Sequence, residues 1–478
     1  MSITNFGANV QFTPRQHYSP RSETEVLEIL SKHRGQRIHA AGSLHAWSEA
    51  ARSEDVYLTL EHLNSVTVSR ESGAAIATIG GGCQIKRALA ELNKQGLTLP
   101  AVGLISEQTI AGSTATGTHG SGRQCLSHYL ETVRIAHYDA VTGEPKITEV
   151  SGGNQLAAAR CSLGCLGIIV SVTVRPRPQY NVEEWLAVYS DLASVLALEA
   201  DWPLQQFYYL AWSDHYLGQH RREAERPRSW LALLYRWHWY LTLDVGMHLV
   251  ICLLVQRLHS AWGVKVFFRY FGLSLVPRRW HVVDRSQDQL IMEHELFRHI
   301  EMEVFVRCEE LAVALDFLRQ AIIEFDGGQG FDDDTRAVLQ QFDLLEMLQV
   351  PRERYTHHYP VCVRRVLPDE TLLTASNGGD DDFYALSLIS YARPHERAGY
   401  FSFCDFVAPA MTAIFRARCH WGKYCPSSSA EIASLYPRLP EFVAVCQQFD
   451  PQRRFANDWL EKMLLATPGH KAATRTAQ

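Results

Sequence analysis

A run of small and hydroxylated residues at positions 110–122 limits most strongly what this chain can fold into. The run reads IAGSTATGTHGSG and lies between two segments that are well patterned for regular structure. Short side chains let a backbone approach a bound group closely. A flexible linker is the alternative, but linkers rarely contain a Thr-Gly-Thr-His-Gly-Ser core between patterned segments. We therefore expect residues of this run to contact a ligand.

Two further glycine segments carry weaker signals. Residues 40–48, AAGSLHAWS, follow a short strand-like run, and successive backbone N–H groups in such a loop can bind an anion such as a pyrophosphate. Residues 162–168, SLGCLGI, fit either a close approach to a flat ligand or a tight turn. Neither segment is a GxGxxG fingerprint or a Walker A loop, so neither identifies a nucleotide by itself.

The first 180 residues mix short helices and short strands. Ser22-Glu23-Thr24-Glu25 has the pattern of a capping box and predicts the start of a helix. Residues 133–138 and 146–150 flank a Thr-Gly turn and predict a hairpin, and the β-branched run at 168–174 predicts a further strand. This mixture of elements indicates an α+β fold.

The character of the chain changes near residue 180, where aromatic residues and long helical stretches begin. We expect a first domain, a second domain, and a C-terminal segment that returns to the first domain and ends in a disordered tail. These parts comprise residues 1–180, 181–420 and 421–478, with strand-like segments at 302–306, 361–366 and 383–391, a helical stretch at 451–465 and the tail at 467–478.

Charge and cysteine usage exclude some classes of protein. The formal net charge of −6 gives no sign of a nucleic-acid partner, which would normally show as a basic surplus. The eleven cysteines are scattered without a CxxC pair, and the polar N-terminus has no apolar core of a signal peptide. We therefore expect a cytoplasmic protein with reduced cysteines that are mostly buried, and no metal site.

One stretch complicates the expectation of a cytoplasmic protein. Residues 230–255, from Trp230 to Val255, are rich in Trp, Leu and Tyr, but ionisable residues such as Arg236 and Asp244 interrupt them. A spanning helix needs roughly 20 predominantly apolar residues, and a central Asp there costs a few kcal/mol. The composition favours a buried helix or a peripheral membrane contact over a span.

Together, the three glycine segments resemble those of the sugar-lactone and alditol oxidases of the vanillyl-alcohol-oxidase flavoprotein superfamily, which include gulonolactone and arabinono-lactone oxidases. The matching motifs lie toward both ends of the chain, and residues 180–290 contain few residues that match the family. Its further motifs are Gly80-Gly81-Gly82, Leu97-Thr98-Leu99-Pro100, His358-Tyr359-Pro360-Val361-Cys362-Val363-Arg364, His420-Trp421-Gly422-Lys423, and Asp450-Pro451 followed by Phe455-Ala456-Asn457. ATGTHGSG followed by HWGK is a specific signature.

The resemblance implies a two-subdomain FAD-binding domain of the vanillyl-alcohol-oxidase type and an α+β substrate domain, the cap. It also assigns residues to the binding of FAD. These are Ala41, Gly42, Ser43, Leu44, His45, Ala46, Gly103, Ser113, Thr116, Gly117, Thr118, His119, Gly120, Ser121, Gly167, Ile168, His420 and Asn457.

Two of these residues have particular roles in the family. His45 falls on the histidine that in many relatives is bonded covalently to the flavin 8α-methyl carbon, which raises the flavin potential; in other relatives the ring only packs beside the flavin. Gly103 falls where a small residue leaves room for oxygen, which implies an oxidase that uses O₂ and forms hydrogen peroxide. A simple turn glycine is the alternative reading of Gly103.

The resemblance places Arg364 and Lys423 in the substrate pocket. A fixed cation there can stabilise the negative charge that develops on the substrate oxygen as hydride leaves the carbon for flavin N5. Lys423 could also assist removal of the proton if desolvation lowers its pKa. Without the resemblance, each residue would be read as a surface cation.

The sequence departs from the family pattern at Cys362. Relatives have a glutamate there that holds or deprotonates the substrate hydroxyl, and a thiol cannot act as a two-oxygen acceptor. His358, Glu301 and Glu303 are the candidates to serve in its place. Otherwise the substrate differs from a polyol, or the usual activity has been lost.

These observations predict an FAD-dependent oxidase that acts on the alcohol carbon of a small molecule, such as a sugar lactone or a polyol-like compound. One alternative is an FAD-linked dehydrogenase or reductase that passes electrons to another acceptor, with residues 230–255 at a membrane. The other is a flavin-binding protein whose pocket has diverged at Cys362.

Overall fold

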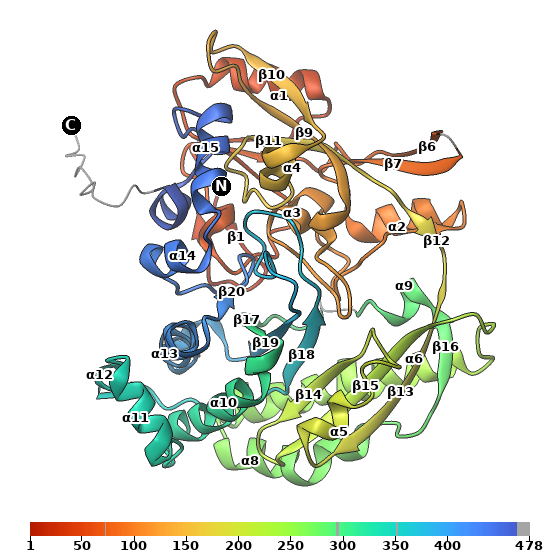
Figure 1. Ribbon diagram of the computed structural model, residues 1–478, viewed down its shortest axis with the longest axis vertical. Helices are drawn as coiled ribbons and strands as arrows, with labels where there is room; N and C mark the ends of the chain where they lie inside the picture. Colours follow the sequence, from red (N-terminus) through yellow and green to blue (C-terminus); the bar gives the residue numbers. More distant parts are fainter. Residues whose placement is uncertain (72, 293–295, 350–351, 466–478) are drawn as a thin grey trace.

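The computed structural model describes residues 1–71, 73–292, 296–349 and 352–465 (Figure 1). Its first part contains a parallel three-stranded sheet in the order β3 (Gln16–Tyr18), β5 (Val56–Thr59), β4 (Ile38–Ala41), with α1 (Glu23–Lys32) packed against neighbouring strands. Ser22 caps α1 as predicted, since its Oγ accepts from the Glu25 N–H at 3.2 Å. The capping box is not reciprocal, however, because the Glu25 carboxylate accepts from the N–H of Arg21 at 2.7 Å.

An antiparallel five-stranded sheet completes this part. Its order is β10 (Pro145–Val150), β9 (Leu130–Tyr138), β11 (Ile168–Val174), β7 (Ala74–Gly80) and β6 (Val66–Glu71). The predicted hairpin is confirmed by the pairing of β9 with β10, in which Val133 lies opposite Val150. The helices here are α2 (Ile85–Asn93), α3 (Ile110–Ala115) and α4 (Gly153–Ala159), and the short strand pairs are β1 (Ile3–Thr4) with β2 (Gln11–Phe12) and β8 (Leu97–Thr98) with β12 (Arg177–Pro178).

The second part is built on an antiparallel eight-stranded sheet. Its order is β16 (Val282–Arg285), β13 (Asn181–Tyr189), β15 (His215–Ala224), β14 (Gln206–Leu210), β18 (Val361–Val366), β19 (Phe383–Ser390), β17 (Ile300–Arg307) and β20 (Arg418–Cys419). The strand-like segments at 302–306, 361–366 and 383–391 thus form three neighbouring strands of it, β17, β18 and β19.

The two faces of this sheet differ because successive side chains of a strand point to opposite sides. One face carries buried apolar residues such as Val363 and Leu386, which pack in one core with α10 (Leu311–Phe325) and α13 (Ala398–Phe415). The opposite face carries polar residues such as Arg364, which turn toward the first part of the molecule and line a cavity. The smaller helices are α5 (Leu192–Leu196), α9 (Ser286–Gln289), α11 (Asp333–Gln341) and α12 (Leu345–Gln349).

The apolar stretch at 230–255 lies in a helical segment inserted between β15 and β16. Helix α6 (Ala232–Trp239) continues through a π-helical turn, Tyr240–Met247, into α7 (His248–Cys252) and a second π-helical turn, Leu253–Arg257, before α8 (Ala261–Val266). Among the described residues, Ala232–Arg257 and α13 are long and apolar enough to span a bilayer. Helix α13 is a core helix, whereas only 22% of the most apolar window of Ala232–Arg257 is buried.

The chain returns to the first part at its C-terminal end, where α14 (Ser429–Leu435) and α15 (Leu439–Phe449) lie beside the N-terminal half (Figure 1). The helix expected at 451–465 begins only at α16 (Asp458–Leu460). The Asn457 side chain caps that helix, and the preceding segment is held on β4, because the Arg454 carbonyl accepts from the Ile38 N–H at 2.8 Å. The tail predicted at 467–478 lies outside the described residues.

Candidate active site

A large cavity lies between the first part of the molecule and the polar face of the eight-stranded sheet. Its empty volume, with the open mouth included, is about 1660 Å³. Residues from the segments 38–47, 104–119 and 163–169 supply one wall, and residues of β14, β17, β18 and β19 and of the segment 420–423 supply the other.

The loop after β4 forms the cradle of the first wall. The loop leaves the carboxyl end of a parallel strand, where ligands of such sheets commonly bind. A Cβ on Gly42 would overlap Oγ1 of Thr109, so only glycine lets the backbone pass there. Ser43 donates to the Glu107 carbonyl at 2.6 Å, and Leu44 has a left-handed φ of 57°. Such strain, roughly 1–3 kcal/mol, is common where a loop is shaped for a ligand.

The residues present fit FAD. The lining of the cavity extends from Ile38 and Gly164 at one end to Lys423 at the other. Loop 42–46 offers successive backbone N–H groups that can bind a diphosphate. Apolar side chains such as Ile105 and Leu163 provide flat walls for a ring system.

Pairing between strands assembles the opposite wall. Tyr208 on β14 lies opposite Cys362 on β18, Cys362 lies opposite Ser387 on β19, and Ser387 lies opposite Glu303 on β17. All four residues line the cavity. A single row across four strands therefore places a phenol, a thiol, a hydroxyl and a carboxylate side by side.

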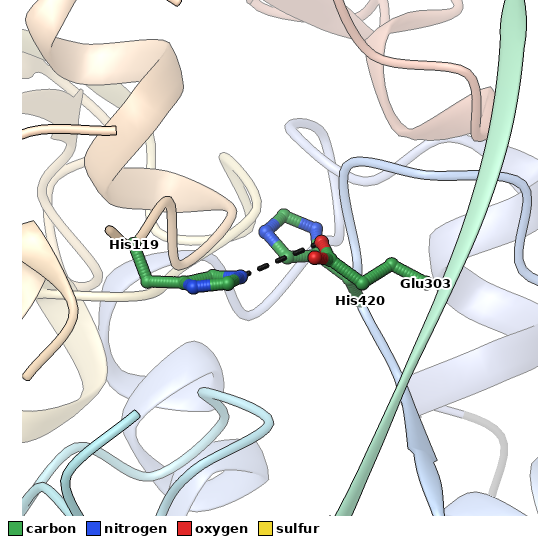
Figure 2. Close-up of side chains that lie close together, drawn as sticks. All are labelled: His119, Glu303 and His420. Atoms are coloured by element: carbon green, nitrogen blue, oxygen red, sulfur yellow. Dashed lines mark ion pairs between the residues drawn. The ribbon is translucent and has the colours of Figure 1, made fainter. Parts of the chain in front are cut away.

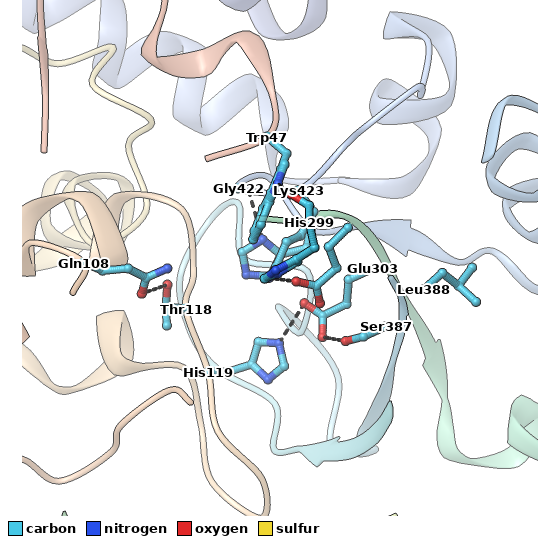
Figure 3. Close-up of polar contacts among 12 residues, drawn as sticks. Trp47, Gln108, Thr118, His119, His299, Glu303, Ser387, Leu388, Gly422 and Lys423 are labelled. Atoms are coloured by element: carbon cyan, nitrogen blue, oxygen red, sulfur yellow. Dashed lines mark hydrogen bonds and ion pairs between the residues drawn. The ribbon is translucent and has the colours of Figure 1, made fainter. Parts of the chain in front are cut away.

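The Glu303 carboxylate is the centre of a buried network. Its Oε1 accepts from Arg364 Nη2 at 2.8 Å and from Ser387 Oγ at 2.7 Å, and Arg364 also donates to Ser387 at 3.0 Å. Its Oε2 lies 3.4 Å from Nε2 of His119 (Figure 3). Burial alone would raise the pKa of Glu303, but Arg364 and His119 outweigh burial and hold that pKa well below its usual range. The carboxylate is thus ionised at neutral pH.

A second ion pair lies beside this network. Lys423 bonds to the carboxylate of Glu301, and its Nζ lies 4.5 Å from the centre of the Trp47 ring. Trp47 is itself fixed, because its N–H donates to the Gly422 carbonyl at 2.9 Å and its indole N–H donates to the His299 carbonyl at 2.9 Å. The cation of Lys423 is thus held at the cavity by one residue from each part of the molecule (Figure 3).

Cys362 places a thiol in the row that also contains the Glu303 carboxylate. Burial raises the pKa of its thiol to about 11, so the thiol remains protonated at neutral pH. The group cannot act there as a base or as an ionic acceptor. Glu303 lies two strands away in the same row and can serve in this role.

His119, Glu303 and His420 form a cluster of potential metal ligands, with donor atoms within 4.8 Å of one another (Figure 2). The hydrogen bonds of His420 disfavour a metal ion. Its Nδ1 accepts from the Gly422 N–H at 2.9 Å, and burial lowers its pKa to about 3, so the neutral ring carries its proton on Nε2. A metal-bound histidine instead donates its second ring N–H to an acceptor. The cluster is better suited to handling a proton.

Most residues predicted for the site are brought together at this cavity. They are Ala41, Gly42, Ser43, Leu44, His45, Ala46, Thr116, Thr118, His119, Gly167, Ile168, Cys362, Arg364, His420 and Lys423. The other predicted residues lie outside its lining: Gly103, Ser113, Gly117, Gly120, Ser121, His358 and Asn457. Gly120 and Ser121 line a separate small cavity, and Asn457 is the cap of α16.

His358 has a structural environment. Its Nδ1 bonds to the Thr356 carbonyl at 2.9 Å, and its Nε2 accepts from the N–H of Tyr391 at 2.8 Å. Burial lowers its pKa to about 4, so the ring is neutral and both nitrogens are engaged. Of the three substitutes considered for the missing glutamate, Glu301 and Glu303 line the cavity and His358 does not.

Sequence reasoning did not single out Tyr208, Ser387, His299 and Tyr359, which also line the cavity. A signal was present for the carboxylates. Glu301 and Glu303 alternate with apolar residues in a strand that is otherwise suited to a core, and a buried carboxylate requires a partner. The tyrosines and the serine carry no comparable local signal.

Comparison with known proteins agrees with this architecture. The sequence profile of the D-arabinono-1,4-lactone oxidase family matches residues 207–463, and that of an FAD binding domain matches residues 14–148. The chain is 49% identical over 464 residues to a long-chain alcohol oxidase of an uncultured marine euryarchaeote, with 97% of each chain covered.

Other similarities are more distant. An L-gulono-1,4-lactone dehydrogenase of Mycobacterium tuberculosis is 24% identical, with 93% of this chain and 95% of that protein covered. The crystal structure of cholesterol oxidase from B. sterolicum superimposes with a TM-score of 0.70 at 14% identity, covering 97% of this chain and 96% of that one. This likeness shows that the two proteins share a fold.

Proposed function

Since the chain belongs to the D-arabinono-1,4-lactone oxidase family, we propose that it uses FAD to oxidise an alcohol with a long alkyl chain and passes the electrons to O₂. FAD-dependent oxidation of a CH–OH donor follows from the family and the fold. The choice of a long-chain alcohol is supported by the relative with 49% identity, which is named a long-chain alcohol oxidase. The observation that carries the chemistry is the ionised, buried Glu303 facing the FAD cradle.

FAD, when bound in the cradle, supplies the acceptor for the hydride of the alcohol carbon. Glu303 is suited to take the hydroxyl proton at Oε2, because Oε1 is already occupied by Arg364 and Ser387. His119 Nε2, 3.4 Å from that oxygen, is placed to share the proton. The network thus holds the base in one orientation.

The two cations of the site have a complementary role. Arg364 is buried and ion-paired, and Glu303 raises its pKa against the effect of burial, so its charge is permanent. Lys423 lies at the same cavity. Preorganised positive charge of this kind stabilises an oxygen on which negative charge develops during hydride loss.

We also propose that His45 is bonded covalently to the flavin. The residue lies in the loop that follows β4, lines the cavity and is buried. Its ring stacks on Phe6 with the centroids 4.9 Å apart, which restricts the orientation of the imidazole. A fixed ring at the cradle is what such a bond requires.

Gly103 supports O₂ as the electron acceptor. A Cβ at this position would lie 2.7 Å from Cγ2 of Thr118, and Thr118 lines the cavity. A larger residue at 103 would therefore displace Thr118 at the cavity wall. Glycine leaves this part of the wall undisturbed, as access of O₂ to a bound flavin would require.

We propose further that the protein is cytoplasmic and attaches to the membrane surface through the segment 230–275. Large apolar side chains of this segment face outward, among them Trp237 at 53% exposure and Trp262 at 74%. Arg257 and Arg269 are exposed on the same segment and would attract anionic lipids. The eleven cysteines, all described and none in a disulfide, support a reducing compartment.

Spectroscopy of the purified protein tests the main proposal. A long-chain primary alcohol added without O₂ should bleach the flavin absorbance, and admission of O₂ should restore it with one peroxide per alcohol oxidised. A yellow protein that no alcohol or lactone bleaches would refute the proposal. A protein bleached by alcohol but restored only by an artificial dye would refute the choice of O₂.

A further inference from the structure

A second, apolar cavity lies between the helical segment 230–275 and the eight-stranded sheet, and we propose that it binds the alkyl chain of the substrate alcohol. This cavity, the tail chamber, has an empty volume of about 550 Å³ with its mouth included. Its wall includes Leu217, Trp239, Leu243, Phe268, Leu273 and Val276. The inference rests on the proposed oxidation of an alcohol and specifies which part of the molecule selects that alcohol.

The tail chamber adjoins the active-site cavity. Tyr208, Met292 and Tyr359 line both spaces, so the two cavities share these three side chains as a common wall. Tyr208 belongs to the row of residues that leads through Cys362 to Glu303. A molecule whose hydroxyl lies at Glu303 therefore has the chamber beside it, past the two tyrosines.

The chemistry of the wall favours an alkyl chain over a sugar. A sugar hydroxyl buried without a partner costs roughly 1–3 kcal/mol, so a sugar site needs several free donors and acceptors. The wall includes the buried carboxylate of Asp244, which is not free, and other polar side chains of the wall are engaged as well. His248 bonds to the Leu243 carbonyl at 3.0 Å and to the Tyr391 hydroxyl at 2.7 Å, and Tyr208 Oη accepts from Gln206 at 2.8 Å. Burial lowers the pKa of His248, so its ring adds no charge.

The position of the chamber agrees with an apolar substrate. Its roof consists of α6, the π-helical turn Tyr240–Met247 and the residues after α8, whose outward side carries the exposed Leu233 and Trp237. The segment therefore presents apolar side chains on both its inner and outer sides. An alcohol that partitions into apolar surroundings meets the same kind of surface at the exterior and in the chamber.

A chain-length series is the first test. For the native holoenzyme, kcat/KM should rise about fourfold with each methylene from butanol upward, until the chamber is filled. A profile that is flat from butanol to dodecanol would overturn the inference, although alcohol oxidation itself would stand.

Filling the chamber is the second test. Val276 lines the chamber and is 8% exposed, so Val276→Trp should lower the ratio of kcat/KM for dodecanol to that for butanol by at least about tenfold. Val313→Trp is the matched control, since Val313 on α10 is 53% exposed and outside the chamber, and it should leave the ratio unchanged. An equal ratio in both variants would place the tail elsewhere.

A binding measurement separates failure of the inference from failure of the proposed function. 1-Bromododecane should quench tryptophan fluorescence saturably, dodecanol should compete, and Trp239→Phe should remove most of the saturable quenching because Trp239 lines the chamber. This readout needs no turnover and no folded Val276→Trp variant. Saturable quenching in a protein that oxidises no alcohol would refute the proposed function and support the chamber. Absence of saturable quenching in an active enzyme would refute the chamber alone.

Discussion

Cys362 and Glu303 lie in one row of the eight-stranded sheet, with Ser387 between them. The row therefore holds its carboxylate two strands away from the thiol. The Arg364 side chain bonds to this carboxylate at 2.8 Å. The first prediction concerns these two residues.

Glu303→Gln should lower kcat by about 10²–10⁴-fold, the range that a general base contributes. The amide oxygen can still accept from Arg364 and Ser387, so the geometry is largely kept while the base is lost. Cys362→Ser is the control, and it should change kcat by well under tenfold because the thiol is protonated in the native protein. Stopped-flow flavin reduction measures both. A larger loss in Cys362→Ser than in Glu303→Gln would contradict the assignment of the base.

His45→Ala should release the flavin on acid precipitation. If His45 carries the covalent bond, the native precipitate stays yellow, whereas that of the variant becomes colourless and its supernatant yellow. The variant should still bind FAD before denaturation, because the other cavity-lining residues of loop 42–46 are unchanged. Equal release of colour from both proteins would show that the flavin is held without a covalent bond.

Gly103→Ala should slow reoxidation of the reduced enzyme by O₂ by roughly tenfold, which corresponds to about 1.4 kcal/mol in the barrier. The physical reason is the displacement of Thr118 by the new methyl group. Anaerobic reduction by substrate serves as the internal control and should keep its rate. Unchanged reoxidation would indicate that Gly103 is only a turn residue.

Buried histidines, among them His357, His358 and His420, make stability depend on pH. Burial lowers the pKa of His357, His358 and His420 to about 3, 4 and 3, below the usual 6.5. The unfolded chain therefore binds more protons, and the free energy of unfolding falls as pH drops below about 6.5. Each histidine contributes a slope of up to about 1.4 kcal/mol per pH unit.

Urea unfolding at pH 7.5, 6 and 5 measures this slope. His358→Gln should reduce the slope of the unfolding free energy below pH 6 by the contribution of about one proton, which is about 1.4 kcal/mol per pH unit. His395→Gln, whose side chain is 74% exposed, is the control and should leave the slope as it is in the native protein. A native slope of zero would mean that the buried rings do titrate in the folded state.

Membrane attachment predicts sedimentation with vesicles of anionic phospholipid. Replacing Trp237 and Trp262 with Gln should weaken partitioning into the vesicles at least about tenfold. In the native protein both exposed indoles would be buried in the membrane surface, and this burial of apolar area stabilises the bound state. Val313→Gln, an exposed apolar residue on α10, is the matched control. Equal sedimentation of both variants would exclude the segment 230–275 as the contact.

The elements that local pattern predicted are those whose signals lie within a few residues. The hairpin of β9 and β10 and the start of α1 at Ser22 follow from turn and cap residues. The helix expected from residue 451 fails for a long-range reason, because the segment before Asn457 docks on β4. No pattern within 451–457 reveals that contact.

The same distinction applies to the site. Loop 42–46 and the run at 110–122 are contiguous, so their composition alone indicated a ligand. The row that joins Tyr208, Ser387 and Glu303 depends on the register of strands that lie far apart in sequence, such as β14 and β18. Short-range periodicity carries no information about such a register.

The alternation of the eight-stranded sheet has an evolutionary consequence. Two alternate residues of each of β17, β18 and β19 line the active-site cavity, while residues between them pack in one core with α10 and α13. Substitutions at the cavity-lining positions can therefore change the substrate while the core positions, which stabilise the fold, stay the same.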